Sequence, residues 1–223
     1  MTTARIRGLR SPQETAAAAR SALYARLAQA LAFPSPELAQ AAARGEFLAG
    51  LEDELAALPY PLHPLPEDRA ALADPALDYP GLEEEYIRLF EVGPGRPPCP
   101  LYEGAHRSGR MKLMEELVRF YHHFGLRTLP GDLPDHLCAE LEFMHYPSFK
   151  ETAAHPAGQP PDPYRRAQRD FLERHLCSWL PRLRAQLDPC GSRPFYGALL
   201  RLAEEVCRQD LAALKGGGAK PDS

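Results

Sequence analysis

The chain has 223 residues, of which 44 % are hydrophobic and 25 % are charged, and its formal net charge is −4. This composition is typical of a globular protein with one sizeable core, and the negative charge argues against nucleic acid as a partner. No apolar run approaches the ~20 residues of a membrane span, and no apolar stretch of a secretory signal follows the first arginines. We therefore expect a cytoplasmic protein without a membrane span.

The residue types favour helices throughout. Alanine and leucine dominate, whereas Ile6 and Ile87 are the only isoleucines, and the 24 prolines indicate many breaks between helices. The sequence predicts an all-α fold, a single-domain helical bundle over residues 11–215. Residues 1–10 are expected to be a flexible N-terminus, and residues 216–223 a disordered tail.

The first predicted helix begins at Ser11 and Pro12, with Glu14 three residues after the serine. A serine cap, proline at the first position and glutamate at the third form a helix start. The helix is expected to end before Pro34. Its apolar face consists of leucines four residues apart, namely Leu23, Leu27 and Leu31.

The next part of the chain combines short helices with proline-rich loops. Short helices are expected over 36–44 and 46–57, a connector over 59–66, and an amphipathic helix around 82–90. Residues 91–104 contain four prolines and three glycines, which exclude a helix or a central strand. A loop of this length inside a helical domain is more often functional than not.

The second half is expected to contain four helices. One covers 109–124, one follows Asp132 as its N-cap and is interrupted at Pro147, and one spans 163–187 with a kink at Pro181. The last begins at Ser192-Arg193-Pro194. The helix over 109–124 is predicted to face inwards with Met111, Met114, Leu117, Val118, Tyr121 and Phe124. Trp179 is predicted to be a core residue, because it shares a helical face with leucines.

No catalytic or metal motif is complete. Glu142-x-x-His145 fits one arm of a di-iron helix bundle, but a second helical copy is missing, and Glu103-x-x-His106 lies beside the Pro/Gly loop. The five cysteines show no zinc spacing and indicate a reducing compartment. Phosphate-binding and nucleophile motifs are also absent from the sequence. We expect no catalytic residues, no metal and no cofactor, and the sequence does not predict nucleotide binding.

The Asp135-His136 pair leaves two interpretations open. An aspartate at a helix start is favoured by the free N–H groups and the helix dipole, so the pair could simply cap a helix. Alternatively, it could be a polar pair at the mouth of a groove that binds a peptide.

Several motifs in a fixed order carry a resemblance to a known family. They are Glu85-Tyr86-Ile87-Arg88-Leu89-Phe90, Pro98-Cys99-Pro100-Leu101-Tyr102-Glu103, Phe120-Tyr121, Pro134-Asp135-His136-Leu137 and Glu140-Leu141-Glu142-Phe143-Met144. Over roughly residues 15–215 the chain resembles the TorD/DmsD/NarJ family, cytoplasmic chaperones for molybdenum enzymes of the dimethyl sulfoxide reductase superfamily. The loop over 91–102 is most similar to chaperones of the type II enzymes.

The resemblance implies a TorD-like helical domain that binds the apo catalytic subunit of a molybdenum enzyme. Binding often involves the N-terminal leader, while the molybdenum cofactor is inserted and before export. The residues implied to contact this client are Tyr102, Glu103, Asp135 and His136. Acids at the rim, Glu103 and Asp135, would suit the arginines of a twin-arginine leader. The resemblance allows a monomer or a homodimer. The alternatives are a generic helical adaptor for a folded partner and a small metal-dependent helical enzyme.

Overall fold

The computed structural model describes residues 11–129, 131–154, 157–191 and 194–216. The predicted flexible residues 1–10, residues 217–223 of the predicted tail and the helix start at Ser192-Arg193 lie outside these ranges, whereas Gly216, predicted as the first tail residue, is the last residue of α11. The elements in chain order are α1 (Pro12–Leu31), α2 (Pro36–Ala43), α3 (Glu46–Ala56), α4 (Pro66–Leu72), α5 (Tyr79–Tyr86), a π-helical turn (Ile87–Glu91), α6 (Glu103–His106), α7 (Arg110–His123), α8 (Leu137–Ala154), α9 (Asp162–Arg174), α10 (Leu176–Leu187), a 3₁₀ turn (Asp188–Cys190) and α11 (Pro194–Gly216).

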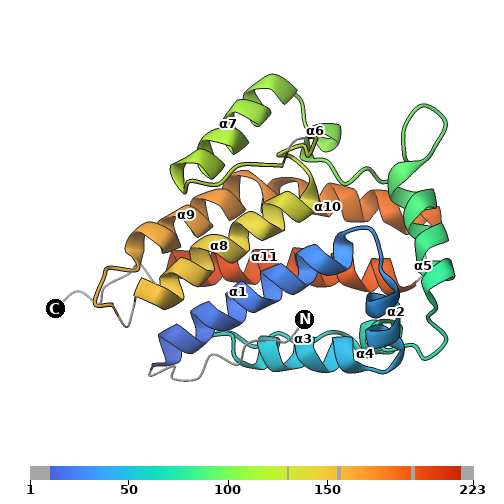
Figure 1. Cartoon of the computed structure of the whole chain (residues 1–223), viewed down its shortest axis with the longest axis horizontal. Helices are drawn as coiled ribbons and strands as arrows, with labels where there is room; N and C mark the ends of the chain where they lie inside the picture. The colour runs from blue at the N-terminus through green and yellow to red at the C-terminus, as the bar shows by residue number, and fades with distance from the viewer. Residues whose placement is uncertain (1–10, 130, 155–156, 192–193, 217–223) are drawn as a thin grey trace.

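The all-α prediction is confirmed over these ranges, where the one β-type contact is an isolated bridge between Tyr102 and His136. In Figure 1, α1 and α8 lie side by side across the middle of the bundle, and α11 runs behind them. Helices α2, α3 and α4 cover one side, and α6 and α7 lie on the other. No helix in the described part of the chain is both long and apolar enough to span a membrane.

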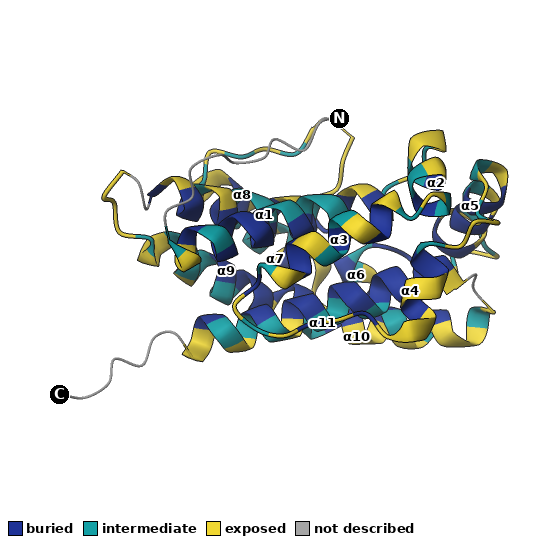
Figure 2. Ribbon diagram, turned by 90° about the horizontal axis from the view of Figure 1, so that it is seen from below, coloured by how far each residue is buried: buried dark blue, intermediate teal, exposed yellow. Residues whose placement is uncertain are grey.

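The local start signals account for the first helices. Ser11 Oγ accepts a hydrogen bond of 3.1 Å from the Glu14 N–H, with Pro12 in the first position, as the sequence predicts. The three leucines of α1 are fully buried (Leu23, Leu27 and Leu31). They belong to one hydrophobic core that runs from Ala19 to Leu214, and Figure 2 shows buried faces turned towards it along the helices. Two helices were not predicted from the sequence: α4, whose start signal is Pro66 in the first turn, and α6, which begins at Glu103 within the segment expected to contain no helix.

The inward face predicted for the helix over 109–124 is partly wrong. Leu117 and Tyr121 are buried as expected, but Met111 is 77 % exposed and Val118 is 36 % exposed. The buried face of α7 instead follows Leu113, Leu117 and Tyr121, which lie at intervals of four residues. At about 100° per residue, Met111 and Val118 fall on a different flank of the helix.

The prediction that Pro147 interrupts the following helix is also wrong. Pro147 is buried inside α8, which packs against α1. Close to the proline, the Ser148 hydroxyl donates to the Met144 carbonyl at 2.8 Å, which supplies a hydrogen bond within the same turn. Asp132 does not cap α8, which begins at Leu137.

The helix predicted over 163–187 is broken at His175, and the kink expected at Pro181 stays a prediction. Pro181 lies within α10, whereas His175 leaves the helical conformation with φ −117° and ψ −97°. The fully buried imidazole reaches a carboxylate on α6, and this contact accounts for the position of the break. Trp179 on α10 is fully buried, as predicted.

Candidate functional site

Two segments that are far apart in the sequence pair like strands beside α6 and α8. The Glu103 N–H donates to the Asp135 carbonyl at 2.8 Å, and the Leu137 N–H donates to the Leu101 carbonyl at 2.8 Å. Between these bonds, the rings of Tyr102 and His136 meet edge to face with centroids 4.9 Å apart. The four residues predicted as a site therefore lie together.

The two acids of this group do not stand at a rim. Glu103 and Asp135 are both 0 % exposed, so the expectation of surface carboxylates at these positions is corrected. Glu103 faces inwards because two partners hold it: His175 Nδ1 lies 2.9 Å from Oε2, and the Arg107 guanidinium pairs with Oε1. Contact of the four residues with a client stays a prediction.

Glu140 completes a buried group with Glu103 and Asp135, which we name the carboxyl cluster. Glu140 is 0 % exposed, and its Oε2 accepts a 3.0 Å hydrogen bond from the indole N–H of Trp179. Burial, and then the neighbouring Glu103, raise the pKa of Glu140 well above its ordinary value. Its Oε1 has no hydrogen-bond partner among the described residues, which suits a carboxyl that stays protonated.

Asp135 is held by the backbone of α6. Its Oδ2 accepts a 3.1 Å hydrogen bond from the Gly104 N–H, and burial raises the pKa of the carboxyl although this bond opposes the rise. A Cβ at position 104 would lie 2.8 Å from the same Oδ2, closer than real Cβ contacts allow. Glycine is thus needed here for the close approach of α6 to Asp135.

His136 both caps a helix and faces a hollow. Its Nδ1 accepts a 3.2 Å hydrogen bond from the Cys138 N–H in the first turn of α8. Burial lowers the pKa of His136, so the neutral imidazole needed for this acceptor role is favoured. The capping role foreseen for the Asp135-His136 pair is therefore carried by the histidine side chain.

Two adjoining hollows of about 320 and 520 Å³ open beside the Tyr102–His136 pair. They share Asp132, Ala139 and Glu142, and we name them together the α1–α8 groove. The smaller hollow is lined by Ala32, Phe33, Tyr86, Tyr102, Gly131, Asp132, Leu133, His136, Cys138, Ala139 and Glu142. The larger one adds Ala25, Gln29, Tyr121, Leu126, Arg127, Thr128, Leu129, Phe143, His145 and Tyr146.

The groove combines apolar side chains with two exposed acids and one exposed arginine, Arg127. Phe33, Leu129 and Leu133 are 51 %, 72 % and 39 % exposed, and apolar side chains that gather at a hollow are typical of a binding surface. Asp132 and Glu142 are exposed and form no ion pair within the described ranges. The sequence analysis did not single out Asp132 or Glu142 as groove acids. The available signal was that each acid lies next to apolar residues in the sequence: Asp132 precedes Leu133, and Glu142 lies between Leu141 and Phe143.

The residues of the possible metal motif have other surroundings. Glu142 is exposed in the groove, and His145 Nδ1 lies 2.9 Å from the Ser21 carbonyl oxygen. Over the described part of the chain, no group of three His, Cys, Asp or Glu side chains is arranged to hold a metal ion.

The fold and site define an all-helical protein with a partly apolar groove and a buried carboxyl cluster, and comparison with known sequences is more specific. The family model "Nitrate reductase delta subunit" matches residues 17–185. The chain belongs to this family, and the resemblance inferred from the motifs is confirmed.

Similar proteins carry related descriptions. The chain is 37 % identical over 191 residues to the perchlorate reductase assembly chaperone protein of Dechloromonas aromatica (strain RCB), covering 83 % of this chain and 85 % of that one. It is 45 % identical over 125 residues to the selenate reductase assembly chaperone protein of Thauera selenatis, covering 54 % and 65 %. The chlorate reductase assembly chaperone protein of Ideonella dechloratans is 45 % identical over 121 residues, covering 52 % and 63 %. Thus the alignments span just under two thirds of the selenate and chlorate relatives.

Proposed function

We propose that the protein is a cytoplasmic assembly chaperone for the catalytic subunit of a molybdenum enzyme of the dimethyl sulfoxide reductase family. The support is the family membership together with relatives described as assembly chaperones of selenate, perchlorate and chlorate reductases. Within this proposal, the chaperone binds the unfinished subunit through its N-terminal leader while the cofactor is inserted.

The observation that carries the proposal is the α1–α8 groove. Its apolar walls suit the apolar face of an amphipathic leader, because burying that face in the groove removes apolar surface from water. Tyr102 and His136 form one wall, and Phe33 and Leu133 contribute exposed apolar surface.

The charges of the groove support a basic leader. Asp132 and Glu142 take the role first expected of Glu103 and Asp135, since they are exposed in both hollows. Carboxylates in this position attract arginines and form charge-assisted hydrogen bonds with them. In this proposal, Glu103 and Asp135 act indirectly by holding Tyr102 and His136 in place.

The test is calorimetric titration with a synthetic peptide that carries the N-terminal leader of a molybdenum catalytic subunit of the dimethyl sulfoxide reductase family. Loss of one charge-assisted bond costs about 1.5–3 kcal/mol, so Asp132→Asn and Glu142→Gln should each weaken binding roughly 10- to 100-fold. Asp53→Asn, an exposed acid on α3, is the matched control and should bind as tightly as the wild type. Unchanged affinity in both groove variants would contradict the proposed groove.

The generic adaptor is distinguished in the same experiment. If the leader peptide does not bind but the folded, cofactor-loaded subunit does, the protein is an adaptor for a finished enzyme. Binding of the leader alone, and weaker binding of the loaded subunit, is expected of an assembly chaperone.

A further inference from the structure

Two free cysteines from distant parts of the chain lie side by side. Cys99 is fully buried in the proline-rich loop, and Cys190 is half-buried at the end of the 3₁₀ turn after α10. Their Sγ atoms are 3.6 Å apart, although 91 positions separate the residues. A disulfide bond is about 2.05 Å long, so the sulfurs need to approach by only about 1.5 Å to bond.

The same short segment holds both cysteines. The Cys99 N–H donates to the Leu89 carbonyl at 2.9 Å, and the neighbouring Arg88 donates from Nη1 to the Cys190 carbonyl at 3.1 Å. Arg88 is itself fixed by Glu85, with N–O distances of 2.9 Å. Since adjacent residues of one helical turn position both partners, the thiols are pre-organised.

We propose that Cys99 and Cys190 form a dithiol site that low-molecular-weight disulfides oxidise to an intramolecular disulfide. The site lies outside the α1–α8 groove, and the inference does not rest on the proposed function. The oxidant is a disulfide of the glutathione class, and its two sulfurs leave as thiols.

The reaction proceeds by two exchanges. The Cys190 thiolate attacks one sulfur of oxidised glutathione, the glutathione S–S bond breaks, and one glutathione thiolate leaves and takes up the proton lost by Cys190. The Cys99 thiolate then attacks Cys190 Sγ, breaks the mixed disulfide and releases the second glutathione, which takes up the proton lost by Cys99. Two protein thiols are oxidised by two electrons, and one glutathione disulfide is reduced to two thiols.

The order of attack follows from accessibility. Cys190 is half-buried and meets the reagent first, whereas Cys99 is shielded. Burial, and then the hydrogen bond with Cys190, raise the pKa of Cys99 to about 12, so its thiolate is scarce and the second exchange is the slower one.

The disulfide would join the loop before Tyr102 to the connection between α10 and α11. The loop continues directly into Leu101, whose carbonyl accepts the hydrogen bond from Leu137. Oxidation therefore restricts the segment that carries one wall of the groove. Backbone amides over 93–101 should exchange hydrogen more slowly in the oxidised protein.

The test is peptide mass spectrometry without reductant after the reduced full-length chain is incubated with oxidised glutathione. Wild type should yield the Cys99–Cys190 cross-linked peptide, and Cys177→Ser, the matched cysteine control, should yield it too. Cys99→Ser should stop at one glutathione on Cys190, and Cys190→Ser should leave Cys99 unmodified. If glutathione accumulates on Cys190 of the wild type and no Cys99–Cys190 cross-link forms, the proposal is overturned.

A second measurement covers the case in which Cys99→Ser, at a buried position, does not fold. Alkylation of wild type with iodoacetamide before oxidation should label Cys190 and abolish the cross-link. The midpoint of thermal unfolding should be several degrees higher for the oxidised wild type than for the reduced wild type, because the disulfide restricts the unfolded chain. Reduction of the disulfide should restore the lower midpoint. A cross-link that forms after Cys190 is alkylated would contradict the site.

Discussion

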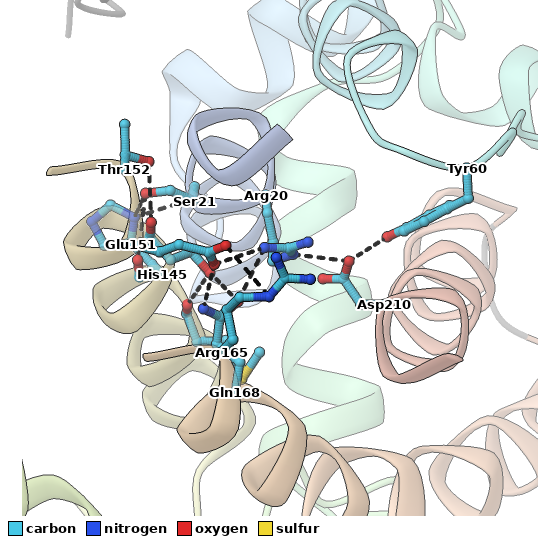
Figure 3. Close-up of polar contacts among 11 residues, drawn as sticks. Arg20, Ser21, Tyr60, His145, Glu151, Thr152, Arg165, Gln168 and Asp210 are labelled. Carbon is cyan, nitrogen blue, oxygen red and sulfur yellow. Dashed lines mark hydrogen bonds and ion pairs between the residues drawn. The ribbon is translucent and has the colours of Figure 1, made fainter. Parts of the chain in front are cut away.

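Two buried polar clusters lie in the same bundle and differ in charge balance. Figure 3 shows the first around Arg20 of α1, with Glu151 of α8, Gln168 of α9, Asp210 of α11 and Tyr60 from the connector. We name it the Arg20 cluster. The second is the carboxyl cluster of Glu103, Asp135 and Glu140.

In the Arg20 cluster, the guanidinium faces two carboxylates. Arg20 Nε lies 3.0 Å from Asp210 Oδ1, and Nη1 lies 3.1 Å from Glu151 Oε2. The Tyr60 hydroxyl donates to Asp210 at 2.7 Å, and the Gln168 amide donates to Glu151 at 2.8 Å. Burial opposes the charge of Arg20, but Asp210 and Glu151 outweigh it and raise the pKa of Arg20.

The carboxyl cluster has more acids than cations. Arg107 and His175 bind Glu103, yet Glu140 and Asp135 each keep a buried oxygen with no donor in the described ranges. Burial is the main reason that the pKa of Glu140 and that of Asp135 are raised; Glu103 adds to the rise at Glu140, whereas Arg110 opposes it at Asp135. We infer that the Arg20 cluster holds α1, α8, α9 and α11 together by balanced charges, whereas the carboxyl cluster, next to the Tyr102–His136 pair, retains a proton on Glu140.

The largest expected effect comes from removing Arg20. In Arg20→Met, two carboxylates stay buried without their cation, which should lower the free energy of unfolding by about 3–5 kcal/mol in urea titrations. Arg165→Met is the control, since Arg165 lies 3.9 Å from Glu151 at a partly exposed position and should cost at most about 1 kcal/mol. Equal losses in the two variants would contradict the central role of Arg20.

A smaller loss is expected from Gly104→Ala. The added methyl group would lie 2.8 Å from Asp135 Oδ2 and force α6 away from the start of α8, at a cost of about 1–3 kcal/mol. The matched control is Gly197→Ala on α11, where the nearest atom to a Cβ is an arginine side-chain nitrogen at 3.4 Å. The loss should be visible by thermal unfolding, and a Gly104→Ala protein as stable as the control would refute the close approach.

The third prediction concerns pH. The pKa of Glu140 is higher in the folded protein than its ordinary value of 4.5. The protonated carboxyl therefore contributes its full stabilisation below pH 4.5, and this contribution is lost as the pH rises through the folded pKa. Between those limits, Glu140 should lower the stability of wild type by about 1.4 kcal/mol per pH unit. Glu140→Gln keeps an acceptor for Trp179 and does not titrate, so it should remove this slope and be more stable than wild type near pH 7.

The measurement is a series of urea titrations from pH 4.5 to 8 on both proteins. Asp135, His106 and His136 titrate in both proteins, so the difference between the two stabilities reports on Glu140 together with its coupling to Glu103 and Asp135. A difference that does not change with pH would show that Glu140 is ionised in the folded state.

Local signals predict the helices of this fold better than its buried polar contacts. The Ser11 cap and the buried leucine face of α1 depend only on residues that are close in the sequence, and both were predicted correctly. The break at His175 was not, because its cause is Glu103, which is 72 residues away. The family motifs led us to expect Tyr102 and His136 in one site. The spacing of these motifs in the sequence does not indicate that the Glu103 and Asp135 side chains are buried.

The most direct test of the central claim is hydrogen exchange of the full-length chain with and without the leader peptide. The account predicts slower exchange over 131–146 and around Phe33, where the peptide would cover the α1–α8 groove. Amides near Asp210 in α11, beside the Arg20 cluster, should exchange at unchanged rates. Protection of α11 with no change over 131–146, at a peptide concentration that saturates binding, would contradict the account.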